Sequence, residues 1–355
     1  MIDSKPMVTV LMPVYNGARY LRQSIESILD QTYKDFELLI IDDASTDASY
    51  KIIHSYHDPR IRIIKNTENM GLIRTLNQGL SLAKGDYIAR QDQDDISYPM
   101  RLEKQVGYLN SHPEVVLLGT GINTIDHQSR NIKSYGFYTA SSEDAICWLL
   151  MFNNPFAHPS VMMRAKIVRD IGGYDEHYVD CEDYDLFSRL ARSYKTTNLK
   201  EVLLTYRCHS NSMNANRSKK NTLLSGSIIR RNFSKYMKVD PDEKLVTLLL
   251  YIYNPGIFDP TVNVRKLLEC IYSIYCKFNF IYPGARKNRE IKKHIACMTL
   301  QVAFNSALKN RFASLCCYLR IFKWDFLLAC GFLPRYIIKL VLVHRKVFTP
   351  KKDNK

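Results

Sequence analysis

The alternation of strand and helix patterns in the N-terminal part constrains the fold more than any other feature of the sequence. Strand patterns are separated by helix patterns at 19–31, 48–57 and 72–83, and the strands themselves lie at 8–13, 36–41, 61–64 and 87–90. Residues 36–41 (Phe-Glu-Leu-Leu-Ile-Ile) are almost continuously apolar, which is typical of a parallel strand buried on both faces. The pattern therefore predicts a doubly wound α/β sheet, whose ligands bind at the carboxyl ends of its strands.

Acidic residues follow two of these strands at the point where each strand ends. Residues 42–43 (Asp-Asp) follow the second strand, and residues 92–95 (Asp-Gln-Asp-Asp) follow the fourth. We expect both groups at one edge of the sheet. Asp92 and Asp94 suit Mg²⁺ or Mn²⁺, which is typically held by one or two carboxylates and substrate phosphates. A solvated acidic turn is the competing interpretation of 92–95, and an Asx turn or helix cap that of 42–43.

Three further residues or pairs are candidates for chemistry. The pair Glu182 and Asp183 precedes a helix pattern at 184–192, so it suits either a general base for an acceptor hydroxyl or a cap of the helix N-terminus. His209 suits a third metal ligand or a diphosphate contact, and His158 is similarly ambiguous, because a histidine in a loop is more often simply exposed. Taken singly, none of these residues decides the function.

Taken in order, these blocks resemble family 2 glycosyltransferases of the GT-A fold. The matching blocks are Val8–Asn16, Asp42–Asp47, Asn69–Gly71, Leu76–Gly79, Gly85–Asp95, Pro99–Leu102, His158–Ser160, Gly172–Asp175, Glu182–Leu186 and Tyr206–His209. They cover roughly residues 7–213. Two positions depart from the family pattern: Ala44 replaces the usual glycine, and Leu76 stands where many relatives have an arginine, for which Arg74 is the candidate substitute.

The resemblance implies a role for each matching residue. Asp183 would be the catalytic base, with Glu182 beside it. The donor nucleotide would contact Pro13, Tyr15, Asp43, Asn77 and Asp92. The metal would be held by Asp94, Asp92 and His209. The acceptor or the diphosphate would be assisted by Arg207, Asp185 and His158.

The implied reaction is a single inverting displacement. Asp183 would take a proton from a hydroxyl of a saccharide or lipid-linked saccharide, and this hydroxyl would attack the anomeric carbon of a nucleotide sugar, most simply a UDP-sugar. Mn²⁺ or Mg²⁺ would neutralise the leaving diphosphate. The product would belong to polysaccharide, O-antigen or capsule biosynthesis.

The positive charge of the chain belongs to its C-terminal part. Residues 216–355 hold 27 Lys and Arg against 8 Asp and Glu, a net +19, whereas residues 1–215 hold 23 against 27, a net −4. The pattern beyond residue 215 is mainly helical. The sequence therefore predicts a GT-A catalytic domain at 1–215 and a basic helical region at 216–355.

Apolar stretches within the basic region favour a membrane surface as its partner. Residues 326–333 and 336–343 are too short and too closely flanked by charge to span a bilayer, but they suit helices lying in its interface. The competing interpretation is a helical appendage that packs on the catalytic domain or on a second subunit, as in a homodimer.

Other classes of protein fit the sequence less well. A basic segment also suits nucleic acid, but here the charges are interleaved with long apolar runs and no recognition motif occurs, so no nucleic-acid partner is expected. Residues 13–17 (Pro-Val-Tyr-Asn-Gly) lack the glycine pattern of a dinucleotide-binding enzyme. A non-catalytic scaffold that binds nucleic acid or membrane stays the alternative to an enzyme.

Cysteine usage and the N-terminus predict where the protein acts. The nine cysteines form no CxxC pair, and no charged-then-apolar signal pattern precedes the first strand. We therefore expect a cytoplasmic protein that is peripheral on the inner face of the cell membrane.

Removal of residues 312–355 should move the protein from the membrane fraction to the soluble fraction, because these residues contain both apolar stretches. Fractionation of the full and the shortened chain after lysis measures this. Deleting only the polar tail, residues 349–355, should leave the distribution unchanged. Equal membrane retention without residues 312–355 would contradict the interfacial helices.

Overall fold

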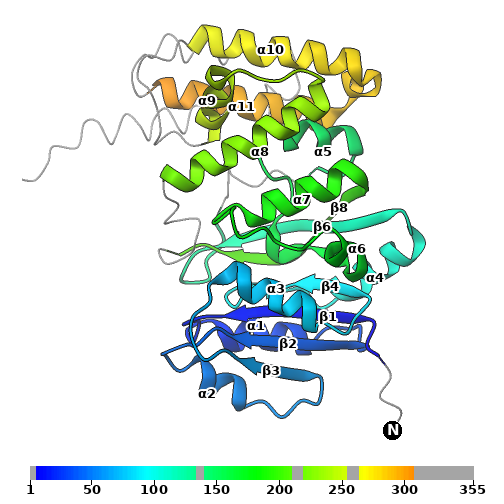
Figure 1. The fold of residues 1–355 in the computed structure, drawn as a ribbon, viewed down its shortest axis with the longest axis vertical. Coiled ribbons are helices and arrows are strands. Elements are labelled where there is room, and N and C mark those ends of the chain that lie inside the picture. The colour runs from blue at the N-terminus through cyan, green and yellow to red at the C-terminus, as the bar shows by residue number, and fades with distance from the viewer. Residues whose placement is uncertain (1–4, 133–139, 210–218, 254–263, 308–355) are drawn as a thin grey trace, which may run out of the picture. The chain divides into compact units, whose positions relative to one another are not determined.

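Figure 1 shows the computed structural model of the chain, which describes residues 5–132, 140–209, 219–253 and 264–307. The chain divides into two compact units, Met1–Ile228 and Ile229–Lys355. The division falls inside one helix, α8 (Lys219–Met237). The domain boundary that the sequence predicts at residue 215 stays a prediction.

The first unit is built on a mixed β-sheet with the strand order β3-β2-β1-β4-β7-β6-β8-β5. Its strands are β1 (Val8–Val14), β2 (Phe36–Asp42), β3 (Ile61–Lys65), β4 (Tyr87–Arg90), β5 (Ile96–Ser97), β6 (Val115–Ile125), β7 (Met162–Arg164) and β8 (Lys195–Arg207). Strands β3, β2, β1 and β4 are parallel neighbours. Strand β7 is antiparallel to both β4 and β6, whereas β6 and β8 are parallel. The predicted α/β sheet is therefore confirmed, with an antiparallel strand inserted beside β4.

The helices of the first unit are α1 (Leu21–Leu29), α2 (Ser49–His54), α3 (Leu72–Leu82), α4 (Arg101–Ser111), α5 (Glu143–Leu150), α6 (Ala165–Asp170) and α7 (Glu182–Ser193), with a short 3-10 helix, η1 (His158–Ser160). The described part of the second unit is helical, which confirms the predicted C-terminal helices. It contains the end of α8, then α9 (Glu243–Tyr253), α10 (Val264–Ile281), η4 (Pro283–Lys287) and α11 (Arg289–Ala307).

Strand β1 separates two packed faces of the sheet. Its even-numbered residues join the main apolar cluster, in which Leu21, Ile25 and Ile28 of α1 are fully buried. The spacing of these three residues places them on one side of the helix, and burying each contributes about 1.5–3 kcal/mol. On the other face α3 lies directly on β1, because a Cβ at Gly79 would stand 2.2 Å from the Leu11 side chain. Helices therefore cover both faces of β1, as predicted.

Across the described ranges, no helix combines the length and the apolar character that a membrane span requires. The two apolar stretches predicted to lie in a membrane interface, 326–333 and 336–343, fall outside the described residues.

The turn after β2 explains why family members usually have glycine where this chain has Ala44. Ala44 has a φ of 59°, in the left-handed region that side chains with a Cβ disfavour. The Ser45 amide donates to Asp42 Oδ1 at 3.2 Å, which holds the turn in this shape. The alanine is accommodated, but at a cost in backbone strain.

Replacing Ala44 with glycine should raise the free energy of unfolding by about 1 kcal/mol, because glycine adopts a positive φ without a steric penalty. Ala83→Gly is a matched control, since Ala83 has a φ of −61° and glycine there should lower stability. Thermal or urea unfolding of the two variants measures both changes. A destabilised Ala44→Gly would contradict the strained turn.

Candidate active site

The carboxyl ends of three strands meet at one edge of the sheet and carry the acidic residues. The register pairs Val14 of β1 with Asp42 of β2, and Leu11 of β1 with Arg90 of β4. The segments that follow β1, β2 and β4 therefore lie beside one another. This confirms the expectation that residues 42–43 and 92–95 share an edge.

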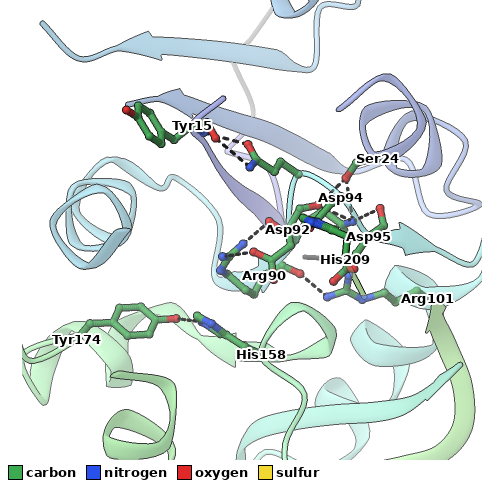
Figure 2. Close-up of polar contacts among 12 residues, drawn as sticks. Tyr15, Ser24, Arg90, Asp92, Asp94, Asp95, Arg101, His158, Tyr174 and His209 are labelled. Atoms are coloured by element: carbon green, nitrogen blue, oxygen red, sulfur yellow. Dashed lines mark hydrogen bonds and ion pairs between the residues drawn. The ribbon is translucent and has the colours of Figure 1, made fainter. Parts of the chain in front are cut away.

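The turn 92–95 is held from within by the amide of Gln91. Its Nε2 donates to the carbonyl oxygens of Asp92 (3.3 Å) and Asp95 (3.0 Å) and to the hydroxyl of Ser24 (3.1 Å). The same hydroxyl donates to the Asp92 carbonyl at 2.7 Å. The backbone of the turn is thereby fixed by buried polar groups, and its acidic side chains lie close together near Arg90 (Figure 2).

Asp92 is paired with a buried guanidinium. Arg90 Nη2 donates to Asp92 Oδ1 at 2.6 Å, and the Arg90 side chain is 1% exposed. Burial raises the pKa of Asp92, the positive charge of Arg90 opposes this rise, and the charge of Asp94 adds to it. One oxygen of Asp92 is therefore bonded to Arg90.

Asp94 is brought together with His209, although 115 residues separate them in the chain. His209 Nε2 lies 2.7 Å from Asp94 Oδ2, and the imidazole packs against the ring of Tyr20 with centroids 5.4 Å apart. The sequence predicts both residues as metal ligands, and the structure places their side chains in direct contact (Figure 2).

Arg207 lies beneath this pair and is buried. Its Nε donates to the Asp94 carbonyl at 3.0 Å, and its backbone amide donates to Asp95 Oδ1 at 2.8 Å. The remaining guanidinium nitrogens donate to Ser129 and Gln23. Arg207 thus holds the acidic turn in place, and its predicted assistance to the diphosphate stays a prediction.

Two predicted nucleotide-binding residues also organise loops of the site. Asp43 accepts hydrogen bonds from the Asn66 side chain and from the amides of Met70 and Gly71, at 2.8–3.0 Å. Asn77 exchanges two hydrogen bonds with the backbone of Tyr174. Both side chains fix a loop whether or not they touch a nucleotide.

The other two predicted nucleotide contacts lie around the end of β1. Pro13 is buried within the strand, whereas the Tyr15 side chain is 46% exposed just beyond it. An exposed aromatic ring at a sheet edge offers a flat apolar surface to a ligand.

Glu182, Asp183 and Asp185 lie in the first turn of α7, where negative charge is favourable. Asp183 Oδ2 accepts from the Asn154 amide at 2.9 Å and is partly open to solvent. Asp185 is fully buried and paired with Arg189 at 2.8 Å, and its predicted assistance to the acceptor or the diphosphate stays a prediction. Glu182 is 5% exposed, and its Oε2 has no hydrogen-bond partner in the described structure.

The buried phenol of Tyr174 is affected by the charges of the acidic turn and of the first turn of α7. Burial raises the pKa of its phenol, the charge of Arg90 opposes the rise, and the charges of Glu182, Asp183 and Asp92 add to it. His158 Nε2 lies 2.8 Å from the Tyr174 hydroxyl. Burial, together with the charge of Arg90, holds the pKa of His158 well below its ordinary value, so the imidazole is neutral.

The residues at the edge fit a divalent metal that also binds a diphosphate. Within the described residues no group of three or more His, Cys, Asp or Glu side chains is arranged to hold a metal by itself. Asp94 and His209 supply an oxygen and a nitrogen at one point, and Asp92 has one oxygen beyond its bond to Arg90. Mg²⁺ and Mn²⁺ accept such an incomplete set when phosphate oxygens complete it.

Sequence reasoning did not assign roles to the buried polar residues that support the site. Arg101 donates to Gln91, to Ser97 and to the Arg90 carbonyl at 2.7–2.9 Å, and burial lowers the pKa of its guanidinium to about 9. The sequence did contain a signal for buried arginines, since Arg90 ends an apolar strand and Arg101 lies on the apolar face of a helix pattern. Buried arginines in such positions are rare unless polar groups surround them.

Comparison with known proteins places the chain in a family. The sequence matches Glycosyl transferase family 2 over residues 9–172. It is 36% identical over 213 residues to the O-antigen biosynthesis glycosyltransferase WbnJ of Escherichia coli, an alignment that covers 58% of this chain and 81% of WbnJ. The chain belongs to glycosyltransferase family 2. This glycosyltransferase is also 40% identical over 212 residues to EpsE of Bacillus subtilis, covering 58% of this chain and 74% of EpsE.

A solved structure of similar fold is S. aureus TarS 1-349 in complex with UDP-GlcNAc. It matches this glycosyltransferase with a TM-score of 0.56 and 14% identity, over 88% of this chain and 89% of that chain. The match concerns the fold and agrees with the predicted GT-A architecture. Asp183 and His209 lie beyond the 9–172 family match, so their placement beside the site comes from the structure itself.

Glu182 should make the stability of the protein depend on pH. Burial and the charge of Asp183 raise the pKa of its carboxyl from 4.5 to about 8 in the folded protein. Between pH 4.5 and about pH 8 the folded state therefore keeps a proton that the unfolded state loses. Over this range the free energy of unfolding should fall by up to ~1.4 kcal/mol for each unit that the pH rises. Glu182→Gln has no proton to lose and should remove this slope.

Urea unfolding at about pH 5 and about pH 8 compares the variants. Glu68→Gln is a matched control, because Glu68 is exposed and this variant should keep the slope of the wild type. A wild-type slope retained in Glu182→Gln would contradict the protonated, buried carboxyl.

Proposed function

We propose that this family 2 glycosyltransferase is an inverting enzyme that transfers a sugar from a nucleotide sugar to a hydroxyl of a saccharide or lipid-linked saccharide. The observation that carries the proposal is the pair of carboxylate groups around Tyr174. The charges of Asp92, Asp183 and Glu182 all act on the pKa of this one phenol, which indicates that both groups lie near it. A single displacement needs such an arrangement, with a base on the acceptor side and a binding site for the leaving group on the donor side.

Asp183 is the proposed catalytic base. It is partly exposed, and the Asn154 amide holds one of its oxygens at 2.9 Å. Glu182 beside it keeps a proton, since its pKa is raised to about 8. The raised pKa of Glu182 leaves Asp183 as the proposed group that takes the proton of the attacking hydroxyl.

The donor end is proposed to bind the nucleoside diphosphate. Tyr15 offers its exposed ring to the base, and Asp43 and Asn77 hold the loops around it. Asp94, His209 and the open oxygen of Asp92 are the proposed holders of Mn²⁺ or Mg²⁺. A bound metal would supply positive charge to the leaving diphosphate. Arg90 and Arg207 keep the acidic side chains in place.

The substrates and location follow from the relatives and the charge distribution. A UDP-sugar is the proposed donor, since a protein of the same fold binds UDP-GlcNAc. Polysaccharide biosynthesis is the proposed context, because WbnJ is named for O-antigen biosynthesis. The net charge of +19 in residues 216–355 supports a position on the inner membrane surface, next to a lipid-linked acceptor. Membership of the glycosyltransferase family favours an enzyme over a non-catalytic scaffold.

Asp183→Asn should lower kcat by about 10²–10⁴-fold while leaving donor affinity nearly unchanged, because it removes the base but not the donor site. Asp94→Ala should instead abolish the effect of Mn²⁺ on donor binding. Sugar transfer and calorimetric titration with UDP-, GDP- and TDP-sugars measure the two effects. Asp170→Asn, on the exposed end of α6, is the control and should behave as the wild type.

Two outcomes would overturn the proposal. One is the absence of binding to every nucleotide sugar with Mn²⁺ or Mg²⁺ present. The other is full activity in both Asp183→Asn and Asp94→Ala. Retention of the anomeric configuration in the product would overturn the inverting mechanism alone.

A further inference from the structure

The side chain of Gln93, between the two aspartates of the acidic turn, binds the backbone of the loop after β1. Gln93 Oε1 accepts from the Tyr15 amide at 2.9 Å, and Gln93 Nε2 donates to the Tyr15 carbonyl at 3.1 Å. One side-chain amide therefore satisfies both backbone groups of a single residue. This two-point contact fixes distance and orientation together, which one hydrogen bond does not.

Gly17 provides the space that this contact needs. A Cβ at Gly17 would stand 2.2 Å from Gln93 Oε1 and 2.5 Å from its Cδ, far inside van der Waals contact. A side chain at position 17 would therefore have to displace the Gln93 amide from its present place. The absence of a side chain at Gly17 thus leaves room for the side chain of Gln93.

The opposite side of the same loop is held by the segment after β2. Asn16 Oδ1 accepts from the amides of Thr46 and Asp47, and the Gly17 amide donates to the Ser49 hydroxyl at 2.9 Å. The loop 15–17 is therefore hydrogen-bonded to two segments, the one after β2 and the acidic turn. The Gln93 amide is the direct link between the acidic turn and the Tyr15 backbone.

We propose that Gln93 is a positioning residue that couples binding of the nucleotide to binding of the metal. Its chain neighbours Asp92 and Asp94 are the proposed metal and diphosphate ligands, and its side chain holds Tyr15, the proposed contact of the base. The inference rests on the proposed function. Coupling of this kind is reciprocal, so metal should tighten nucleotide binding by the same factor as nucleotide tightens metal binding.

The test is the coupling factor, measured by titrating the full chain with UDP, GDP and TDP in the absence of metal and with saturating Mn²⁺. We expect a factor of about 5–150 in the wild type, which is the usual range of such coupling. In Gln93→Ala the factor should fall several-fold, and the coupling that stays comes from direct contact of the metal with the diphosphate. Gln128→Ala, an exposed glutamine, is the control and should keep the wild-type factor.

Gly17→Ala supplies a second variant that displaces Gln93 without altering it. It should lower the coupling factor as Gln93→Ala does, and the double variant should be no worse than either single variant. A role that is only structural would lower the melting temperature and all affinities without changing the coupling factor. Unchanged coupling in Gln93→Ala, or fully additive effects of the two substitutions, would overturn the proposal.

The wild-type titration separates this inference from the proposed function. Absence of binding of UDP, GDP and TDP to the wild type with Mn²⁺ would overturn both. Metal-linked binding in the wild type with equal coupling in Gln93→Ala would overturn only the role of Gln93.

Discussion

A guanidinium buried at the end of a central strand has to be balanced by negative charge, and in this protein that requirement arranges the site. Removing an ion from water costs several kcal/mol even after relaxation, and Arg90 is 1% exposed. Its charge is met by Asp92 at 2.6 Å and also acts on Tyr174, His158 and Glu182. Asp92 and the groups around Tyr174 thus share the influence of one buried positive charge.

The acidic turn places three carboxyl groups close together in a poorly solvated place. Burial raises the pKa of Asp95 well above its ordinary value, and the charges of Asp94 and Asp92 raise it further. Neighbouring carboxylates repel one another most strongly in a poorly solvated place. A divalent cation at Asp94 would relieve this repulsion, so the energetic tension in the turn agrees with the proposed use of a metal.

The sequence predicted those parts of the fold in which local pattern and tertiary environment agree. Strand β4 has the bounds expected from the pattern, because it is a short, mostly apolar run. Strand β8 begins with mostly polar residues that gain their order from pairing with β6, so the local pattern does not predict its first half. Strand β7 has three residues, too few for a periodic signal.

The site shows the same limit of local information. The order of the motifs identified the candidate residues, but it did not identify the side chains to which they are hydrogen-bonded. The contact of Asp94 with His209 spans 115 residues, and no local pattern encodes it. The pairing of Asp185 with Arg189 was predictable, because residues four apart on a helix face each other. Gln93 carried no signal in the sequence, since its meaning depends on a loop 78 residues away.

The position of Leu76 shows how this chain differs from relatives that have arginine there. Leu76 is fully buried on the core side of α3, whereas Arg74 lies two residues away, roughly 200° around the helix. Arg74 is instead exposed and paired with Glu176 at 2.9 Å. It therefore does not replace the missing arginine.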